Sequence, residues 1–400
     1  MKKTYLDYAA TSPVDPQVVK AMLPYWTLDY GNPSSPHSWG SKARSALKKS
    51  RNLVAKFLNC KSDEVIFTSC ATEANNLSLK GAVESWQQVN KGKTPHIIVS
   101  SIEHHCVLDA ALHLQKQGVK VTFVKVDKSG LVNPKEVEKI LSKNTVLVSI
   151  IFGNNEIGTI QPIAEIGLML KKYKDKNNYP LFHTDAVQAV QYLDLNVNRL
   201  HVDLLSASAH KFYGPKGVGF LYIKKGTSIT KQQDGGSQEF AKRAGTENTA
   251  GIVGLAKALE LVLKHKSMEV KRLTTLRDYL IKKLLFSIPD IQLTGHAKKR
   301  LPHIASFVVP GAEGEAMLLH LDDKSIAATS GSACSSGELK PSHVLLSLGI
   351  KPEVAHGSLR FSLGKYTTLK DIDNLIKVLP NIVRNLRIMN PLYKLNKYKK

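Results

Sequence analysis

A lysine at the end of an apolar segment is the residue of this 400-residue chain that is best placed to act as a nucleophile. Lys211 follows the run Ser206-Ala-Ser-Ala-His and precedes the turn-forming Gly214-Pro-Lys-Gly. A lysine amine attacks an aldehyde when its surroundings favour the neutral amine, and a strand end that opens into a cleft removes part of its water. Since the chain contains 56 Lys and Arg, most of them expected at the surface, this one lysine is a weak indication until other residues support it.

Asp185 supplies a second group of the right kind. It follows the apolar run Tyr179-Pro-Leu-Phe, so it also lies at an expected strand end. A carboxylate there can pair with a protonated pyridine nitrogen. Pyridoxal phosphate needs both a lysine for its aldehyde and an anion that keeps its ring protonated. An isolated aspartate in this setting is more often a turn or strand-end residue, and that alternative stays open for Asp185 taken alone.

A third segment resembles a phosphate site. Val65-Ile-Phe-Thr-Ser reads as a buried strand, and a helical pattern begins at Thr72, with Cys70-Ala71 as the joint. The N–H groups at such a helix start receive an anion, and the Thr72 hydroxyl adds a donor. An ordinary helix cap explains the same pattern. The combination of cradle, carboxylate and lysine is what favours pyridoxal phosphate.

The residues that carry this chemistry also carry a resemblance to a known family. The chain looks like a cysteine desulfurase of the class V aminotransferase family, of the type that supplies sulfur for iron–sulfur cluster assembly. The similarity runs nearly end to end through these motifs: Tyr5-Leu-Asp-Tyr-Ala-Ala-Thr, Gly31-Asn-Pro-Ser-Ser, Ala71-Thr-Glu-Ala-Asn-Asn, Glu103-His-His, Asn154-Asn-Glu-Ile-Gly, His183-Thr-Asp-Ala-Val-Gln, Ser208-Ala-His-Lys, Arg243-Ala-Gly-Thr-Glu-Asn, Ser330-Gly-Ser-Ala-Cys-Ser-Ser and Ser358-Leu-Arg-Phe-Ser-Leu-Gly.

The pattern of the chain predicts an α/β fold with a second, smaller domain. Between residues 65 and 225, apolar strand-like runs alternate with helical patterns, which is typical of a mostly parallel sheet wrapped by helices. The remainder reads as α+β, and a helical stretch from Glu247 toward Leu285 bridges the two parts. The resemblance implies a fold type I pyridoxal phosphate enzyme. We expect residues 1–15 to join the small domain, residues 16–260 to bind the cofactor and residues 261–400 to form the small domain.

The resemblance also implies a role for each site residue. Lys211 would carry the cofactor and move the Cα proton, with His104 stacked on the ring face and also catalytic. Arg360 would clamp the substrate α-carboxylate bidentately, which lysine cannot reproduce. The implied cofactor-binding residues are Ala71, Thr72, His104, Asn155, Asp185, Gln188, Ser208, His210, Lys211 and Thr246, of which Thr246 reaches in from a second subunit and Asn155 also contacts substrate.

Two alternatives to these roles stay open, and a third, a metal site, is not favoured. His104 can be a helix-cap histidine, and Arg360 can be an ion-paired surface arginine. Glu103-His104-His105 also suggests a metal site, but adjacent histidines on a helix point in different directions, so we expect no metal there.

Cys334 distinguishes the desulfurase from its relatives. It lies in the small, polar, glycine-punctuated run Thr329-Ser-Gly-Ser-Ala-Cys-Ser-Ser-Gly, which predicts an exposed, mobile loop. Exposure is one requirement of a reactive thiol. By resemblance, Cys334 attacks the sulfur of L-cysteine, alanine leaves, and the sulfur stays on Cys334 as a persulfide for an acceptor such as an iron–sulfur scaffold. Cys60, Cys70 and Cys106 lie in or beside apolar segments and are interpreted as small hydrophobic residues.

Composition and sequence patterns indicate the cellular location and the kinds of partner to expect. The chain has no C-x-x-C spacing and no apolar run long enough to cross a membrane, and its first residues lack a secretory signal, so we expect a cytoplasmic protein. The net charge of +23 is spread along the chain without a nucleic-acid-binding motif, so any such binding should be nonspecific.

Three departures from the family pattern and two rival functions remain. Cys70 and Ser237 stand where glycine is usual, and the tail from Pro391 differs from the scaffold-docking tail of housekeeping members. A selenocysteine lyase or another class V aminotransferase or lyase is the nearer rival, although an aminotransferase has no use for Cys334. A basic nucleic-acid-binding module is the more distant one.

Overall fold

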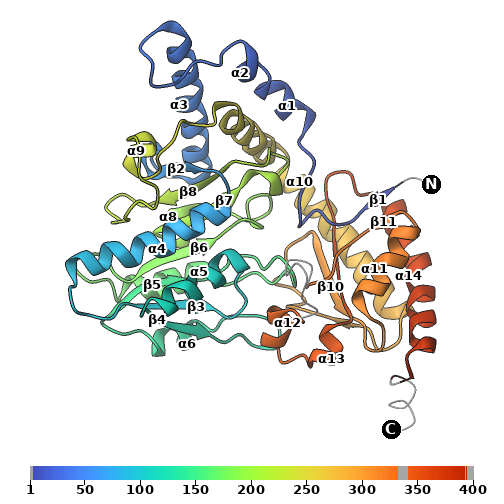
Figure 1. Cartoon of the computed structure of the whole chain (residues 1–400). Helices are drawn as coiled ribbons and strands as arrows, with labels where there is room; N and C mark the ends of the chain where they lie inside the picture. Colours follow the sequence, from blue (N-terminus) through green and yellow to red (C-terminus); the bar gives the residue numbers. More distant parts are fainter. Residues whose placement is uncertain (1–2, 332–340, 392, 394–400) are drawn as a thin grey trace.

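A seven-stranded sheet forms the centre of the chain, which the computed structural model describes over residues 3–331, 341–391 and 393 (Figure 1). The strand order is β2-β8-β7-β6-β5-β3-β4. β8 pairs antiparallel with both β2 and β7, and the other neighbours are parallel. The strands are β2 (Val65–Thr68), β3 (His96–Ser100), β4 (Lys120–Val124), β5 (Thr145–Ser149), β6 (Leu181–Asp185), β7 (Leu204–Ser208) and β8 (Gly219–Ile223).

Apolar side chains on both faces explain why these segments are strands. Every residue of β3, β5, β6, β7 and β8 is buried, as expected for sheet strands that helices cover on both sides. One hydrophobic cluster joins the sheet to α3 (Ser38–Leu58) and the first half of α10 (Thr249–Ser287), and another joins it to α4 (Ala71–Val89) and α5 (His105–Lys116). The helices of this body are α1 (Pro16–Met22), α2 (Pro24–Thr27), α3 (Ser38–Leu58), α4 (Ala71–Val89), α5 (His105–Lys116), α6 (Pro134–Lys139), α7 (Ile163–Lys171), α8 (Val197–Leu200) and α9 (Gln238–Ala241), with 3-10 turns at Ser62–Glu64 and Ala209–Lys211.

A smaller sheet forms the core of the second body. Its order is β12-β10-β9, all antiparallel, and a separate parallel pair joins β1 to β11. The first residues of the chain therefore lie beside the small sheet rather than the large one (Figure 1). The elements are β1 (Thr4–Tyr5), β9 (Gln292–Leu293), β10 (Ile304–Val308), β11 (Ile326–Ala327), β12 (Ser358–Ser362), α11 (Gly314–Asp323), α12 (His343–Ser347), α13 (Pro352–Ala355) and α14 (Leu369–Met389).

The helix α10 (Thr249–Ser287) is continuous for 39 residues and passes from one body to the other. Its first residues, including Ile252 and Leu259, belong to the core of the large body. Leu273, Leu280 and Leu284 belong to the core of the small one. The expected bridging helix is present, and the limit between residues 260 and 261 falls inside it, so that limit stays a prediction.

The strand ends that carry the expected site residues lie where the sequence predicts them. Asp185 is the last residue of β6, and Lys211 ends the 3-10 turn that directly follows β7. The carboxyl ends of parallel strands meet at one edge of a sheet. This edge faces the small body.

Candidate active site

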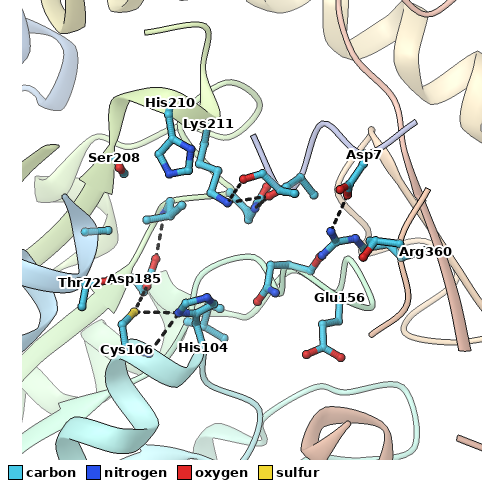
Figure 2. Close-up of a pocket in the computed structure, with 18 of the residues that line it drawn as sticks. Asp7, Thr72, His104, Cys106, Glu156, Asp185, Ser208, His210, Lys211 and Arg360 are labelled. Atoms are coloured by element: carbon cyan, nitrogen blue, oxygen red, sulfur yellow. Dashed lines mark hydrogen bonds and ion pairs between the residues drawn. The ribbon is translucent and has the colours of Figure 1, made fainter. Parts of the chain in front are cut away.

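A cavity of about 450 Å³ lies at this edge, between the sheet and the small body (Figure 2). The polar and charged side chains that line it come from segments far apart in the sequence. The lining residues include most of the predicted site residues: Ala71, Thr72, His104, Asn155, Asp185, Gln188, Ser208, His210, Lys211 and Arg360.

Lys211 projects into this cavity with its amine held by backbone carbonyls. Nζ donates to the carbonyl oxygens of Ala9 at 2.8 Å and Ala10 at 2.7 Å. Both acceptors belong to the N-terminal Tyr5-to-Thr11 segment, and Figure 2 shows the side chain reaching toward it. The Gln191 side-chain amide donates to the Lys211 carbonyl at 2.6 Å and so anchors the turn from the other side. The N-terminal segment thus helps to aim the lysine.

Asp185 is a buried carboxylate on the cavity wall. Its Oδ2 accepts from Asn75 Nδ2 at 2.7 Å, and its Oδ1 accepts from the backbone N–H of Val187 at 3.0 Å. The Cys106 thiol lies 3.8 Å from the same Oδ2. These neighbours donate hydrogen bonds, so the two carboxyl oxygens are held in place on the cavity wall. The arrangement suits an anion that faces a positively charged ring nitrogen.

His104 caps a helix and lines the cavity at the same time. It is the N-cap residue of α5, and its Nδ1 accepts from the Cys106 N–H at 3.2 Å. The cap interpretation of His104 is therefore correct, and it does not conflict with a place on the cavity wall. Burial lowers the pKa of His104, and the neighbouring Lys211 and His105 lower it further, while Asp185 acts in the opposite direction. With Nδ1 acting as an acceptor, the neutral ring carries its proton on Nε2.

The start of α4 has the N–H groups that the predicted anion cradle requires. Within the described chain, the N-cap residue Cys70 makes no side-chain cap hydrogen bond, so the first-turn N–H groups of this 19-residue helix are left for a ligand. Thr72 and Ser208 line the same part of the cavity. His210 joins them, and burial, together with Lys211 and Lys216, lowers its pKa to about 4. Pyridoxal phosphate fits this combination of a lysine amine, a buried carboxylate, a histidine ring and a helix start that can bind an anion.

Arg360 enters the cavity from β12 of the small body. Nη2 pairs with Asp7 Oδ1 at 2.9 Å, and Nη1 donates to the Asn155 carbonyl at 2.8 Å. Its Nε is buried and has no hydrogen-bond partner among the described residues. Arg360 is ion-paired, as in the alternative expected from the sequence, but it is not a surface arginine: its side chain is buried, Asp7 is partly buried, and both line the cavity.

Glu156 is a buried acid on the same wall for which the sequence indicated no role. The Ser342 hydroxyl donates to its Oε2 at 2.5 Å, and Figure 2 shows its carboxyl apart from the other labelled side chains. Burial raises the pKa of Glu156 to about 7, although the Ser342 hydrogen bond and Arg360 lower it in part. Asp7 and Glu156 both lie within recognised motifs, so motif membership was the one signal that could have identified them.

Two predicted site residues are not part of the described cavity. Thr246 is exposed in the segment between α9 and α10 and does not line it. Cys334 lies outside the described residues. Thr329, Ser330 and Gly331, which precede it, do line the cavity.

Cys106 packs against the hydrophobic cluster between the sheet and α4 and α5, as the sequence predicts, and it also lines the cavity. Cys70 lines the cavity too, but it belongs to no hydrophobic cluster among the described residues. Cys106 accepts from Asn75 Nδ2 at 2.9 Å, and burial and then Asp185 raise the pKa of its thiol. Cys60 does pack against the core of the large body. The departures at Cys70 and Ser237 need no glycine, since φ is −172° at Cys70 and −85° at Ser237.

Two kinds of feature are absent from residues 3–331, 341–391 and 393. No group of three or more His, Cys, Asp or Glu side chains there could hold a metal ion. No helix in that part of the chain has the length and apolar character needed to cross a membrane.

Comparison with known proteins identifies the family of the chain. Residues 4–375 match the aminotransferase class-V family. The chain is 48% identical to cysteine desulfurase IscS of Dictyoglomus turgidum over 99% of both chains. It is also 48% identical to cysteine desulfurase IscS of Clostridium botulinum, over 98% of this chain and 97% of the relative.

Solved structures give the same result. A NifS-like protein matches 96% of this chain at 36% identity with a TM-score of 0.88. SspA in complex with cysteine matches 92% at 32% identity with a TM-score of 0.78. The predicted α/β fold with a mostly parallel sheet is confirmed. The chain therefore belongs to the cysteine desulfurases of the class V aminotransferase family, enzymes that depend on pyridoxal phosphate.

Proposed function

We propose that this chain converts L-cysteine to L-alanine and carries the sulfur away as a persulfide on Cys334, for iron–sulfur cluster assembly or other sulfur delivery. The observation that carries this proposal is the meeting of Lys211, Asp185 and Arg360 around one cavity whose wall continues into the segment before Cys334. When bound, pyridoxal phosphate supplies an aldehyde for the lysine amine and a protonated ring that accepts the electron pair of a broken bond.

We assign a separate role to each group of lining residues. The Asp185 carboxylate would pair with the protonated ring nitrogen, His104 would hold the ring face, and Gln188 and Asn155 would hold the ring and the substrate. Ala71, Thr72, Ser208 and His210 hold the phosphate at the start of α4. Arg360 binds the substrate carboxylate, and Lys211 Nζ removes the Cα proton.

The sulfur step balances without an external oxidant. The Cys334 thiolate forms an S–S bond to the substrate sulfur while the substrate C–S bond breaks. The electron pair of that bond stays with the carbon fragment, which takes up a proton and leaves as alanine. L-cysteine and one thiol thus give L-alanine and one persulfide.

Incubation with L-cysteine tests this proposal when alanine and protein-bound sulfur are measured together. We expect alanine and persulfide in equal amounts in the first turnover, and a reductant should release the bound sulfur as sulfide. Alanine without protein-bound sulfur would indicate a lyase of another type. Pyruvate or a new amino acid as the product would indicate another class V enzyme.

We also propose a homodimer whose sites are shared. Thr246 is exposed and lies outside its own cavity, as expected if it serves the partner subunit. Around α1 and α2, large apolar side chains stay exposed: Leu23, Trp26, Leu28 and Tyr30 are each at least half exposed. Figure 1 shows these helices at the outer end of the large body, where a second copy could cover them.

Mixed dimers test the shared site. A Lys211→Ala subunit paired with a Thr246→Arg subunit contains one site with an intact lysine and an intact partner threonine. We expect up to half of the wild-type activity, whereas each pure variant should be inactive or weak. No recovery on mixing would reject the shared site, and sedimentation shows whether the dimer forms.

The destination of the sulfur and the cellular location also belong to this proposal. An acceptor such as an iron–sulfur scaffold protein should take labelled sulfur from the persulfide form, and Cys334→Ser should transfer none. We place the protein in the cytoplasm, and cell fractionation tests that location.

A further inference from the structure

His303 is a buried histidine for which neither the sequence nor the proposed reaction gives a role. It lies directly before β10 in the small body and is 2% exposed. Its ring stacks on Tyr192 with centroids 4.3 Å apart and an interplanar angle of 26°. Its Nε2 lies 3.2 Å from Oε1 of Gln188, which belongs to the large body and lines the cavity.

The hydrogen bonds around Gln188 determine where its proton donors point. Nε2 of Gln188 donates to the Ala9 carbonyl at 2.9 Å. The reverse orientation of this amide would set its oxygen against the Ala9 oxygen, so Oε1 must face His303. An amide oxygen only accepts, and His303 Nε2 must therefore carry a proton.

The remaining ring nitrogen confirms a single tautomer. Nδ1 of His303 is buried and has no hydrogen-bond partner in the part of the chain described. Burial lowers the pKa of His303 to about 3, and the positive charges of Arg360, Arg277 and Lys211 act in the same direction. The ring is thus neutral at physiological pH, with its proton on the nitrogen that faces Gln188.

The Ala9 carbonyl connects this pair to the active lysine. It accepts from Gln188 Nε2 and, at 2.8 Å, from Lys211 Nζ. His303 donates to Oε1 of Gln188, and the Ala9 carbonyl accepts one of the two Gln188 N–H groups. Gln188 can therefore offer only its second N–H to a ligand in the cavity.

We propose that His303 is a positioning residue: its Nε2 proton holds Oε1 of Gln188, so that the Gln188 amide presents only N–H donors to the cofactor pocket. This inference rests on the proposed function of the cavity. By the family resemblance, Gln188 would approach the phenolic oxygen of the cofactor ring, and an N–H donor there would favour the ionised form of that oxygen. An oxygen stabilised in this way holds the proton that it shares with the Lys211 nitrogen less tightly. A residue of the small body thereby lowers the pKa of the cofactor that the large body binds.

His303→Phe tests the proposal, because phenylalanine retains a ring to stack on Tyr192 and lacks the donor. The measurement is the pH midpoint of the cofactor absorbance change in the holoenzyme without substrate. We expect the midpoint to rise by roughly half to one pH unit, the effect of about one hydrogen bond. His303→Gln, which can place an N–H near the position of Nε2, should restore the wild-type midpoint. Neither change alters a titratable group that lines the cavity.

Two controls separate positioning from packing. His96→Phe replaces another buried histidine, one that bonds to Thr145 and Thr122 away from the cavity, and should lower stability without moving the midpoint. In a Gln188→Leu background, His303→Phe should cause no further shift. An unchanged midpoint in His303→Phe, or additive shifts in the double variant, would overturn the proposal.

A measurement on the native protein covers the case in which the variants do not fold. Nitrogen-15 shifts of the His303 ring in the holoenzyme should show a neutral ring protonated at Nε2, and protonation at Nδ1 would reject the proposal. None of these readouts requires turnover. Failure to form alanine would count against the proposed function and would leave this test standing.

Discussion

Asp7 and Arg360 form an ion pair across 353 residues of sequence, with Oδ1 of the carboxylate 2.9 Å from Nη2. Asp7 belongs to the N-terminal segment and Arg360 to β12, and both line the cavity. The pair places a carboxylate of the protein on the arginine that we expect to bind the carboxylate of the substrate. The two carboxylates therefore compete for one guanidinium group.

Asp7→Asn should lower the KM for L-cysteine roughly threefold to tenfold, an effect on the order of 1 kcal/mol. Arg360 would keep its hydrogen bond to the Asn155 carbonyl and lose only the competing anion. Steady-state kinetics measure the change. Asp15→Asn, which removes the ion pair with Lys365 elsewhere in the chain, is the matched control. A higher KM in Asp7→Asn alone would mean that Asp7 orients Arg360 rather than competing with substrate.

Arg360→Lys should raise the KM for L-cysteine by roughly tenfold to a hundredfold, because lysine cannot give two parallel N–H bonds to a carboxylate. Cofactor absorbance should be unchanged, since Arg360 is assigned to substrate. If the KM stays at the wild-type value, Arg360 does not hold the substrate carboxylate.

Lys211→Ala should abolish alanine formation and leave a folded protein, because the side chain projects into a cavity and not into the core. Lys211→Arg keeps a cation and N–H donors near the Ala9 and Ala10 carbonyls, yet it lacks an amine that can react, so it should be equally inactive. Lys216→Ala, at an exposed lysine of the same turn, should retain activity. Normal alanine formation by either Lys211 variant would refute its assignment.

Cys334→Ser should bind cofactor and L-cysteine and release almost no alanine, since a hydroxyl is scarcely ionised at neutral pH and attacks sulfur poorly. Mass spectrometry of the wild type after exposure to L-cysteine should find one added sulfur on the peptide that contains Cys334. Cys60→Ser is the matched control, because burial raises the pKa of the Cys60 thiol to about 12. Full alanine production by Cys334→Ser would reject the role of Cys334 and indicate a class V enzyme that does not form a persulfide there.

The raised pKa of Glu156 predicts that the free energy of unfolding decreases as the pH rises. Burial raises its pKa in the folded chain from 4.5 to about 7, so the folded state binds more protons than the unfolded state between these values. The contribution of Glu156 is therefore fully present below about pH 4.5 and is lost as the pH rises through 7.

Glu156→Gln should remove this part of the pH dependence, an effect on the order of 1 to 3 kcal/mol across that range. Denaturant unfolding of the wild type and the variant from pH 5 to pH 7.5 gives the difference. Glu103, whose pKa burial raises to about 8, titrates in both proteins and cancels in this comparison. A flat difference curve would mean that Glu156 is already ionised in the folded state.

The local pattern of the chain was enough to predict the strand ends that carry chemistry. Asp185 and Lys211 each follow an apolar run, and such runs become buried strands because burial of apolar area dominates folding. The alternation of strands and helices then predicted a mostly parallel sheet. Parallel strands bring their carboxyl ends to one edge, which is why residues such as Thr72 and Lys211 were expected together.

The sequence by itself thus determined the kinds of groups available and the edge at which they meet, because both follow from local periodicity and residue chemistry. Only the tertiary structure decided which side chains pair across that edge. The contacts of Asp7 with Arg360 and of His303 with Gln188 join segments that are 353 and 115 residues apart. Cys106 reads as a small apolar residue in its helix, yet its thiol lies beside Asn75 and Asp185. Periodicity reports whether a position is buried, and the identity of the neighbour depends on how the two bodies pack.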